Sequence, residues 1–181
     1  MSEELEVLKI VAKRLDGAKI VYMISGSIAA NLYTVPRMTR DIDIVVELKR
    51  ADLDRFVETF ENDFLVDREM VKEEVGRNGI FNIIHKEFVL KIDFILRQLS
   101  LFQDTAFTRR QKVLIEGQPM WFISPEDLIL AKLLWAKDSQ SEMQLNDVRN
   151  IFRTSRNLDK TYIAKWIPQL GLEEIHKKAG L

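Results

Sequence analysis

The chain has 181 residues, no cysteine, and 27 lysines and arginines against 28 aspartates and glutamates. The absence of cysteine excludes disulfides, a thiol nucleophile and a thiolate zinc site, and the net charge of −1 gives no sign of a nucleic-acid or membrane surface. No stretch approaches the ~18 apolar residues that span a bilayer, and the first residues do not resemble a secretory signal. We therefore expect a cytoplasmic protein without a membrane partner.

The first two thirds of the chain predict strands that alternate with helices. Apolar periodicity and β-branched runs indicate, in chain order, a helix over 2–16, a strand over 19–24, a helix over 28–33, a strand over 41–47 and a helix over 51–60. The segment 61–79 is charged and weakly patterned, and we expect only a short strand and an exposed turn there. Hairpins are predicted over 81–96 and 111–123.

The last third predicts only helices. Residues 124–127 combine a serine cap, a first-turn proline and an acidic residue three positions after the cap, which together indicate a helix start. Helices are expected over 125–138, 141–153, 159–168 and 171–179. On the first of them, the expected apolar face contains Leu128, Ala131, Leu134 and Trp135.

These elements together predict an α/β (α+β) fold. We expect a mixed sheet flanked by helices and followed by a helical C-terminal part. The predicted core covers residues 1–123, and the helical part, packed on it, covers residues 124–181.

Three aspartates are arranged as a metal-phosphate enzyme needs them. Asp41 and Asp43 alternate with isoleucines, so in a strand both carboxylates point to one face while the isoleucines point into a core. Lys91 and Asp93 follow the same rule on a later strand. Three carboxylates close together resist ionisation unless a cation offsets their charge, so we predict that Asp41, Asp43 and Asp93 bind Mg²⁺ or Mn²⁺. The simpler interpretation of Asp41 and Asp43 is a solvated acidic pair.

Gly26 and Ser27 lie where the first strand passes into a helix. Glycine lets the backbone N–H groups of such a turn approach a phosphate closely, and a helix N-terminus favours negative charge. The Ser27 hydroxyl can donate to a phosphate oxygen, so we predict that this turn binds NTP, although Gly26 also suits an ordinary turn. Arg37 and Arg40 are candidates for steering the triphosphate, or alternatively for ion pairs on the surface.

The combined pattern resembles a known family. A glycine-serine turn, a helix, an Asp-hydrophobic-Asp strand (Asp41 to Asp43) and a later strand with a single aspartate are similar to the signature of the nucleotidyltransferase fold shared with polymerase beta. Residues 36–43 and 124–133 resemble the minimal nucleotidyltransferases that include the AbiEii-type toxins. The resemblance spans residues 18–153.

The resemblance implies roles for particular residues. It makes Asp41, Asp43 and Asp93 the catalytic metal ligands, with phosphate bound at Gly26 and Ser27. Toxins of this type also use a lysine and a following aspartate. These correspond to Lys132 and Asp147. The pattern alone also suits a packed Lys132 whose ammonium reaches solvent and an Asp147 that merely begins a helical turn.

The sequence therefore predicts a metal-dependent nucleotidyltransferase that moves an NMP from NTP to an acceptor and releases pyrophosphate. The toxin resemblance implies tRNA or protein as the acceptor and an antitoxin as a partner. The Arg-x-x-Arg-Asp-Ile-Asp pattern is similar to that of small antibiotic nucleotidyltransferases, which implies a drug hydroxyl instead. A non-catalytic nucleotide-binding or antitoxin-like module of the same fold is the alternative, and the presence of all three carboxylates argues against it.

Overall fold

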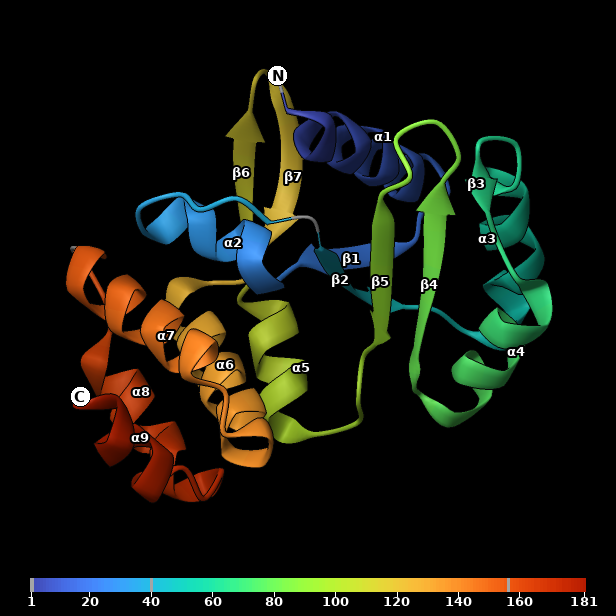
Figure 1. Cartoon of the computed structure of the whole chain (residues 1–181). Coiled ribbons are helices and arrows are strands. Elements are labelled where there is room, and N and C mark those ends of the chain that lie inside the picture. Colours follow the sequence, from blue (N-terminus) through green and yellow to red (C-terminus); the bar gives the residue numbers. More distant parts are fainter. Residues whose placement is uncertain (1, 40, 156) are drawn as a thin grey trace. The chain divides into compact units, whose positions relative to one another are not determined.

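The computed structural model describes residues 2–39, 41–155 and 157–181, in two compact units (Figure 1). Unit 1 contains residues up to 28 and from 39 to 122, and unit 2 contains residues 29–38 and from 123 onward. Helix α2 (Gly26–Tyr33) begins in unit 1 and ends in unit 2. Within the described ranges, no helix is both long enough and apolar enough to cross a bilayer.

Unit 1 is built on a mixed sheet, which confirms the predicted fold class. Seven strands are present in the described ranges, namely β1 (Val21–Ile24), β2 (Ile42–Glu47), β3 (Phe64–Leu65), β4 (Ile80–His85), β5 (Lys91–Leu96), β6 (Gln111–Ile115) and β7 (Gln118–Phe122). Their order across the sheet is β3-β4-β5-β2-β1-β7-β6 (Figure 1). β2 is parallel to β5 and β1 is parallel to β7, whereas the other neighbours are antiparallel. The two predicted hairpins form as β4–β5 and β6–β7.

The helices of unit 1 include two that the sequence pattern did not indicate. They are α1 (Glu3–Gly17), α3 (Leu53–Phe60) after a 3-10 turn η1 (Arg50–Asp52), α4 (Arg68–Arg77) and α5 (Leu101–Thr108). The short strand expected within 61–79 is β3, but most of that segment is α4, so the expectation of no helix there was wrong. α4 buries only Val71, Glu74 and Val75, and this leaves too little apolar periodicity to detect.

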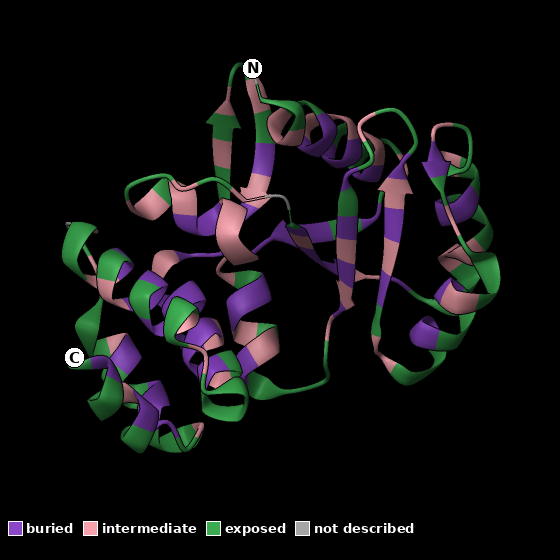
Figure 2. Ribbon diagram, in the orientation of Figure 1, coloured by how far each residue is buried: buried purple, intermediate pink, exposed green. Residues whose placement is uncertain are grey.

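An aromatic cluster determines which face of β5 points into the core. Phe94 stacks on Phe81 of β4 with 5.2 Å between ring centroids, and Phe56 of α3 meets Phe94 edge-on at 5.1 Å. Buried and less buried residues alternate along β5 (Figure 2). Asp93 therefore points to the opposite face from Phe94. Burial of each ring contributes ~2 kcal/mol, and a register slip by one residue would bury Asp93 instead. Core packing therefore sets the position of the acidic residue.

Unit 2 is helical and is centred on α6. Its helices are α6 (Pro125–Ser139), α7 (Glu142–Thr154), α8 (Lys160–Gln169) and α9 (Glu173–Ala179), close to the predicted bounds. α6 contacts the other three helices. The predicted apolar face of α6 was partly wrong, because Trp135 is 57% exposed while Ile129, Leu133 and Ala136 are fully buried.

The predicted cap of α6 is confirmed. The Ser124 Oγ accepts a hydrogen bond from the Asp127 N–H at 3.2 Å and donates to Asp127 Oδ2 at 2.6 Å. The Tyr162 hydroxyl of α8 donates to the other oxygen of Asp127, also at 2.6 Å. Ser124 thus caps α6, and the fully buried Asp127 carboxylate holds the Ser124 hydroxyl and ties α8 to α6.

Segment 29–38 joins unit 2 through hydrogen bonds of Tyr33. Its hydroxyl donates to the Ile123 carbonyl at 2.6 Å, and the Thr154 hydroxyl donates to the Tyr33 carbonyl. Burial and the charges of Glu126 and Asp127 raise the pKa of Tyr33 to about 12, so the hydroxyl keeps its proton near neutral pH. The division predicted after residue 123 did not anticipate that this segment groups with the C-terminal helices.

Candidate active site

The acidic residues of unit 1 lie on two neighbouring strands. β2 and β5 run parallel, and their register pairs Asp43 with Asp93. Both residues are half-buried, between isoleucine and phenylalanine positions that are fully buried. Adjacent strands lie about 4.8 Å apart, so the two carboxylates project side by side. Asp41 directly precedes β2 and is exposed.

A lysine lies among these carboxylates. The Lys91 ammonium is 2.7 Å from Asp93 Oδ2, and the two side chains are 46% and 19% exposed. The hydrogen bond with Asp93 raises the pKa of Lys91 above its usual value, and the charges of Asp93, Asp41 and Asp43 act in the same direction against partial burial. The sequence pattern placed Lys91 on the face of Asp93, but no role was inferred for it. Lys91 supplies positive charge where the sequence pattern predicted a metal ion alone.

The carboxylates do not form a closed metal cage. Across the described residues, no group of three or more histidine, cysteine, aspartate or glutamate side chains is arranged to hold a metal ion. The donor chemistry nevertheless suits a hard cation, because carboxylate oxygens are the ligands that Mg²⁺ and Mn²⁺ prefer. Assignment of Asp41, Asp43 and Asp93 as metal ligands therefore stays a prediction.

Gly26 packs its backbone against Asp43. It adopts a left-handed conformation with φ of 62°, and a Cβ placed on it would lie 1.9 Å from Asp43 Oδ2 and 2.8 Å from Asp43 Cβ. The Ser25 N–H also donates to the Asp43 carbonyl at 2.9 Å. Gly26 therefore does more than permit a turn, since it allows the start of α2 to approach the acidic strand. Ser27 is half-buried in the first turn of α2.

We expect that Gly26→Ala destabilises the protein by about 1–3 kcal/mol, because alanine disfavours positive φ and its methyl group collides with Asp43. Urea unfolding measures the change. Gly17→Ala is the matched control, since a Cβ at Gly17 meets no atom within 4 Å. Equal free energies of unfolding for Gly26→Ala and the parent would contradict the close approach.

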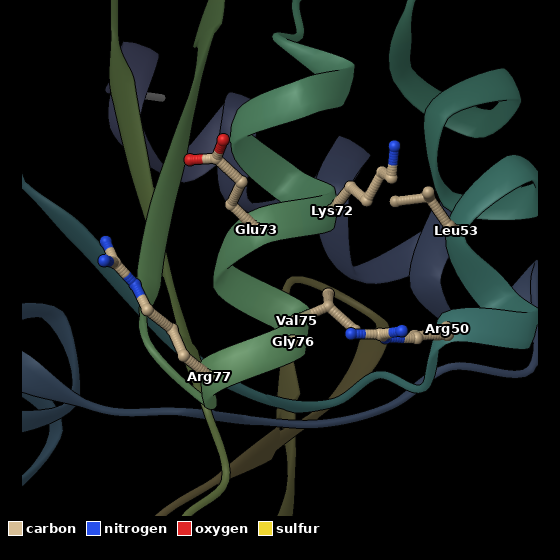
Figure 3. A pocket seen from close by; sticks show the side chains of 7 residues that line it. All are labelled: Arg50, Leu53, Lys72, Glu73, Val75, Gly76 and Arg77. Atoms are coloured by element: carbon tan, nitrogen blue, oxygen red, sulfur yellow. The ribbon is translucent and has the colours of Figure 1, made fainter.

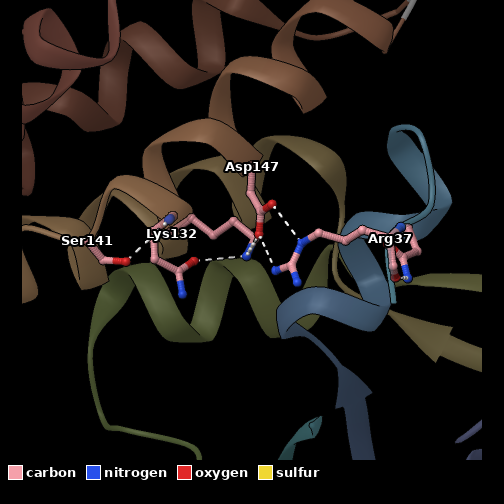
Figure 4. A network of polar contacts seen from close by, with 6 residues as sticks. Arg37, Lys132, Ser141 and Asp147 are labelled. Carbon is pink, nitrogen blue, oxygen red and sulfur yellow. Dashed lines mark hydrogen bonds and ion pairs between the residues drawn. The ribbon is translucent and has the colours of Figure 1, made fainter. Parts of the chain in front are cut away.

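Two further predicted residues, Lys132 and Asp147, meet inside unit 2. The Lys132 ammonium donates to Asp147 Oδ2 at 2.8 Å and to Gln144 Oε1 at 2.9 Å (Figure 4). Arg37 donates to both oxygens of Asp147, at 3.2 Å from Nε and 3.1 Å from Nη2 (Figure 4). The Lys132 and Asp147 side chains are only 4% and 6% exposed. Lys132 is therefore a buried ion-pair partner, and its ammonium does not extend to solvent.

The sequence left two alternatives open for Arg37, and the structure shows one of them, an ion pair. Arg37 and Asp147 are separated by 110 positions in the chain, and no local pattern signals their contact. Arg40 lies outside the described residues, so its predicted role in binding the nucleotide is not addressed by the structure.

The buried Asp147 should make the free energy of unfolding depend on pH in the acid range. Burial raises the pKa of its carboxyl, but hydrogen bonds and charge from Arg37 and Lys132 outweigh this, so the pKa lies below the ordinary value of 3.8. A lowered pKa stabilises the folded state above pH 3.8, and this contribution is lost as the pH falls through the folded-state value. We expect that unfolding free energy falls more steeply with acid below pH 4 in the parent than in Asp147→Asn. If unfolding free energy depends on pH equally in the parent and in Asp147→Asn, the lowered pKa of Asp147 is contradicted.

Unit 1 has a surface groove whose lining includes none of the predicted site residues. The groove has a volume of about 640 Å³ and is lined by Arg50 and Leu53 of η1 and α3 and by residues of α4 (Figure 3). The side chains of Lys72 and Arg77 point away from each other (Figure 3). The two cations therefore do not converge on one ligand position.

The chain matches the model of a family described as "Nucleotidyltransferase of unknown function (DUF6036)" over residues 2–153. No curated protein matches it. Similar solved structures include an antigenic nucleotidyltransferase-like protein from Paracoccidioides brasiliensis, with 19% identity, a TM-score of 0.57 and coverage of 98% of this chain and 92% of that chain. The antibiotic-resistance factor ANT(2'')-Ia has 16% identity, a TM-score of 0.59 and 97% coverage of both chains.

The lincosamide antibiotic adenylyltransferase LnuA, solved with lincomycin bound, has 15% identity and a TM-score of 0.57, with coverage of 86% of this chain and 98% of that chain. At these identities the likeness shows the fold alone, which is that of nucleotidyltransferases. Because the family match covers most of its length, the chain belongs to this family of nucleotidyltransferases.

Proposed function

We propose that the chain is a metal-dependent nucleotidyltransferase that transfers an NMP from NTP to an acceptor hydroxyl and releases pyrophosphate. The observation that carries this proposal is the parallel register that pairs Asp43 with Asp93, with the Gly26 backbone against Asp43. This arrangement sets two hard oxygen donors beside a helix start, where phosphate oxygens are favoured. The family match supports the same reaction class.

In this proposal Asp43 and Asp93 hold Mg²⁺ or Mn²⁺, and Asp41 adds a third carboxylate. Mg²⁺ commonly takes one or two protein carboxylates together with substrate phosphates, so an incomplete protein cage fits an ion that arrives with NTP. When bound, the metal would polarise the α-phosphate and offset charge on the leaving pyrophosphate.

The chain's own groups bind and orient the substrates. The N–H groups at the start of α2 and the Ser27 hydroxyl donate to phosphate oxygens of NTP. Asp93 accepts the proton of the acceptor hydroxyl or serves as a metal ligand. By resemblance to such toxins Lys132 would contribute to transfer, and since its ammonium is buried against Asp147 it would do so by positioning and not by contact with the substrates. Its role is proposed from that resemblance alone.

For the acceptor we propose a macromolecule, either tRNA or protein, as for a toxin that is paired with an antitoxin. The basic segment 109–112 is a weaker candidate for binding RNA than its composition suggests. The Arg110 guanidinium lies over the rings of Phe107 and Trp121, at 4.7 Å and 4.8 Å from their centroids. A drug hydroxyl is the second candidate, because two of the similar structures are antibiotic-modifying proteins.

The acceptor experiment uses the purified protein, Mg²⁺, four α-labelled NTPs and either total RNA, cell protein or a panel of hydroxylated antibiotics. We expect label in tRNA or protein. Incorporation into RNA should fall steeply between 50 and 200 mM salt, since phosphate contacts are salt-dependent, whereas incorporation into a protein or a drug should change little. If label appears only in an antibiotic, the acceptor is the drug and not a macromolecule. Bound NTP without incorporation into any acceptor would favour a non-catalytic binding module.

A further inference from the structure

Lys91 is positioned to control access to the carboxylates. It is the first residue of β5 and points to the same face as Asp93, two residues later. Its ammonium contacts Asp93 Oδ2 at 2.7 Å. Asp43 lies opposite Asp93 in the parallel register, and Asp41 directly precedes the Ile42 position that pairs with Ile92. Lys91 thus contacts one of the three carboxylates proposed to hold the metal and lies beside the strand positions of the other two.

The contact with Asp93 is close but not deeply buried. The Lys91 side chain is 46% exposed, and exposed ion pairs are weakly held, so water and ions can compete with this one. A lysine ammonium has three donors on a flexible stem and can leave without movement of the strand. A divalent cation coordinated by two or three carboxylates and phosphate oxygens is held more strongly than one half-exposed ammonium.

We propose that Lys91 is an internal counterion that occupies Asp93 in the free protein and is displaced from it when the divalent metal binds. The proposal rests on the proposed function, because it concerns the metal of that reaction. Its consequence is that the free protein binds Mg²⁺ or Mn²⁺ weakly. The metal binds tightly only when NTP contributes phosphate ligands, so metal and nucleotide bind together.

The test is equilibrium binding of Mn²⁺ without nucleotide, in which electron paramagnetic resonance counts the free ion. Lys91→Met should bind Mn²⁺ roughly ten-fold more tightly than the parent, because it removes the competing positive charge. Lys91→Arg keeps the charge and should behave as the parent does. Lys13→Met on α1 is the matched control for loss of one positive charge at an exposed site, and its affinity should also match that of the parent.

A second pair of variants separates displacement from simple charge. In an Asp93→Asn background, Lys91→Met should improve Mn²⁺ affinity by less than about two-fold, because the ammonium no longer holds a ligand carboxylate. An equal gain in both backgrounds would show a general charge effect and overturn the proposal. Unchanged or weaker binding by Lys91→Met in the Asp93 background would also overturn it. Should Lys91→Met fail to fold by circular dichroism, Lys91→Gln replaces it in the same comparison.

The experiment also distinguishes this proposal from the function on which it rests. If the parent binds Mn²⁺ with NTP and Asp43→Asn does not, the metal site is supported whatever Lys91 does. If neither the parent nor Lys91→Met binds Mn²⁺, with or without NTP, the proposed metal dependence fails, and the role of Lys91 fails with it.

Discussion

Asp43→Asn is expected to weaken Mg²⁺-dependent binding of NTP by at least ~100-fold while leaving the protein folded. Removal of a group that only hydrogen-bonds a metal ligand typically lowers metal affinity by about 10–100-fold. Removal of a ligand itself should lower the affinity further. Asparagine has the shape of aspartate, so it preserves the packing of this side chain against the Gly26 backbone. Calorimetric titration with NTP, with and without Mg²⁺, measures the effect.

Glu87→Gln is the control for this experiment. Glu87 is an exposed residue of the β4–β5 connection, so its substitution removes the same charge outside the acidic pair. It should bind NTP as the parent does. If Asp43→Asn and the parent show equal affinity in Mg²⁺, metal-bridged binding at this strand is excluded.

Lys132→Ala is expected to lower the free energy of unfolding by about 3 kcal/mol, because it leaves the buried Asp147 carboxylate without one of its two cationic partners. The sequence pattern suited a Lys132 whose ammonium reaches solvent, and loss of such a lysine would cost little stability. The structure revises that expectation, since Lys132 is 3% exposed on a face of α6 that packs inside unit 2. Urea unfolding measures the loss, and activity of Lys132→Ala must be compared under conditions in which the variant is folded.

Lys165→Ala on α8 is the matched surface control and should change stability by less than about 0.5 kcal/mol. The double variant Lys132→Ala with Asp147→Ala should lose less stability than the sum of the single variants, because neither charge is then left buried without its partner. Additive losses, or a Lys132→Ala variant as stable as the parent, would contradict a buried ion pair.

Local patterns predicted much of the fold. Alternation along β2 and β5 predicted which residues face the core, because a strand has a period of two whatever it packs against. The start of α6 was predicted because Ser124 and Asp127 are close in sequence and bond each other directly. Alternation also predicted that Lys91 and Asp93 share one face of β5, and their ion pair confirms it.

Features that depend on distant contacts could not be predicted in this way. α6 is surrounded by three helices, so one apolar stripe does not describe its buried surface, and Lys132 was misjudged. The Arg37 contact with Asp147 joins segments that no periodicity relates. The parallel pairing of β2 with β5 is also non-local, and the alternation within each strand does not determine that Asp43 and Asp93 are paired.

The most direct test of the central claim is the fate of each phosphate of NTP. The protein is incubated with Mg²⁺ and acceptor, using NTP labelled at the α-phosphate in one reaction and at the γ-phosphate in another. We predict that the α-label becomes bound to the acceptor while the γ-label leaves as pyrophosphate, and that both events are lost in EDTA and in Asp43→Asn. Transfer of the γ-label to the acceptor, or its release as free phosphate, would show a kinase or a hydrolase and contradict nucleotidyl transfer.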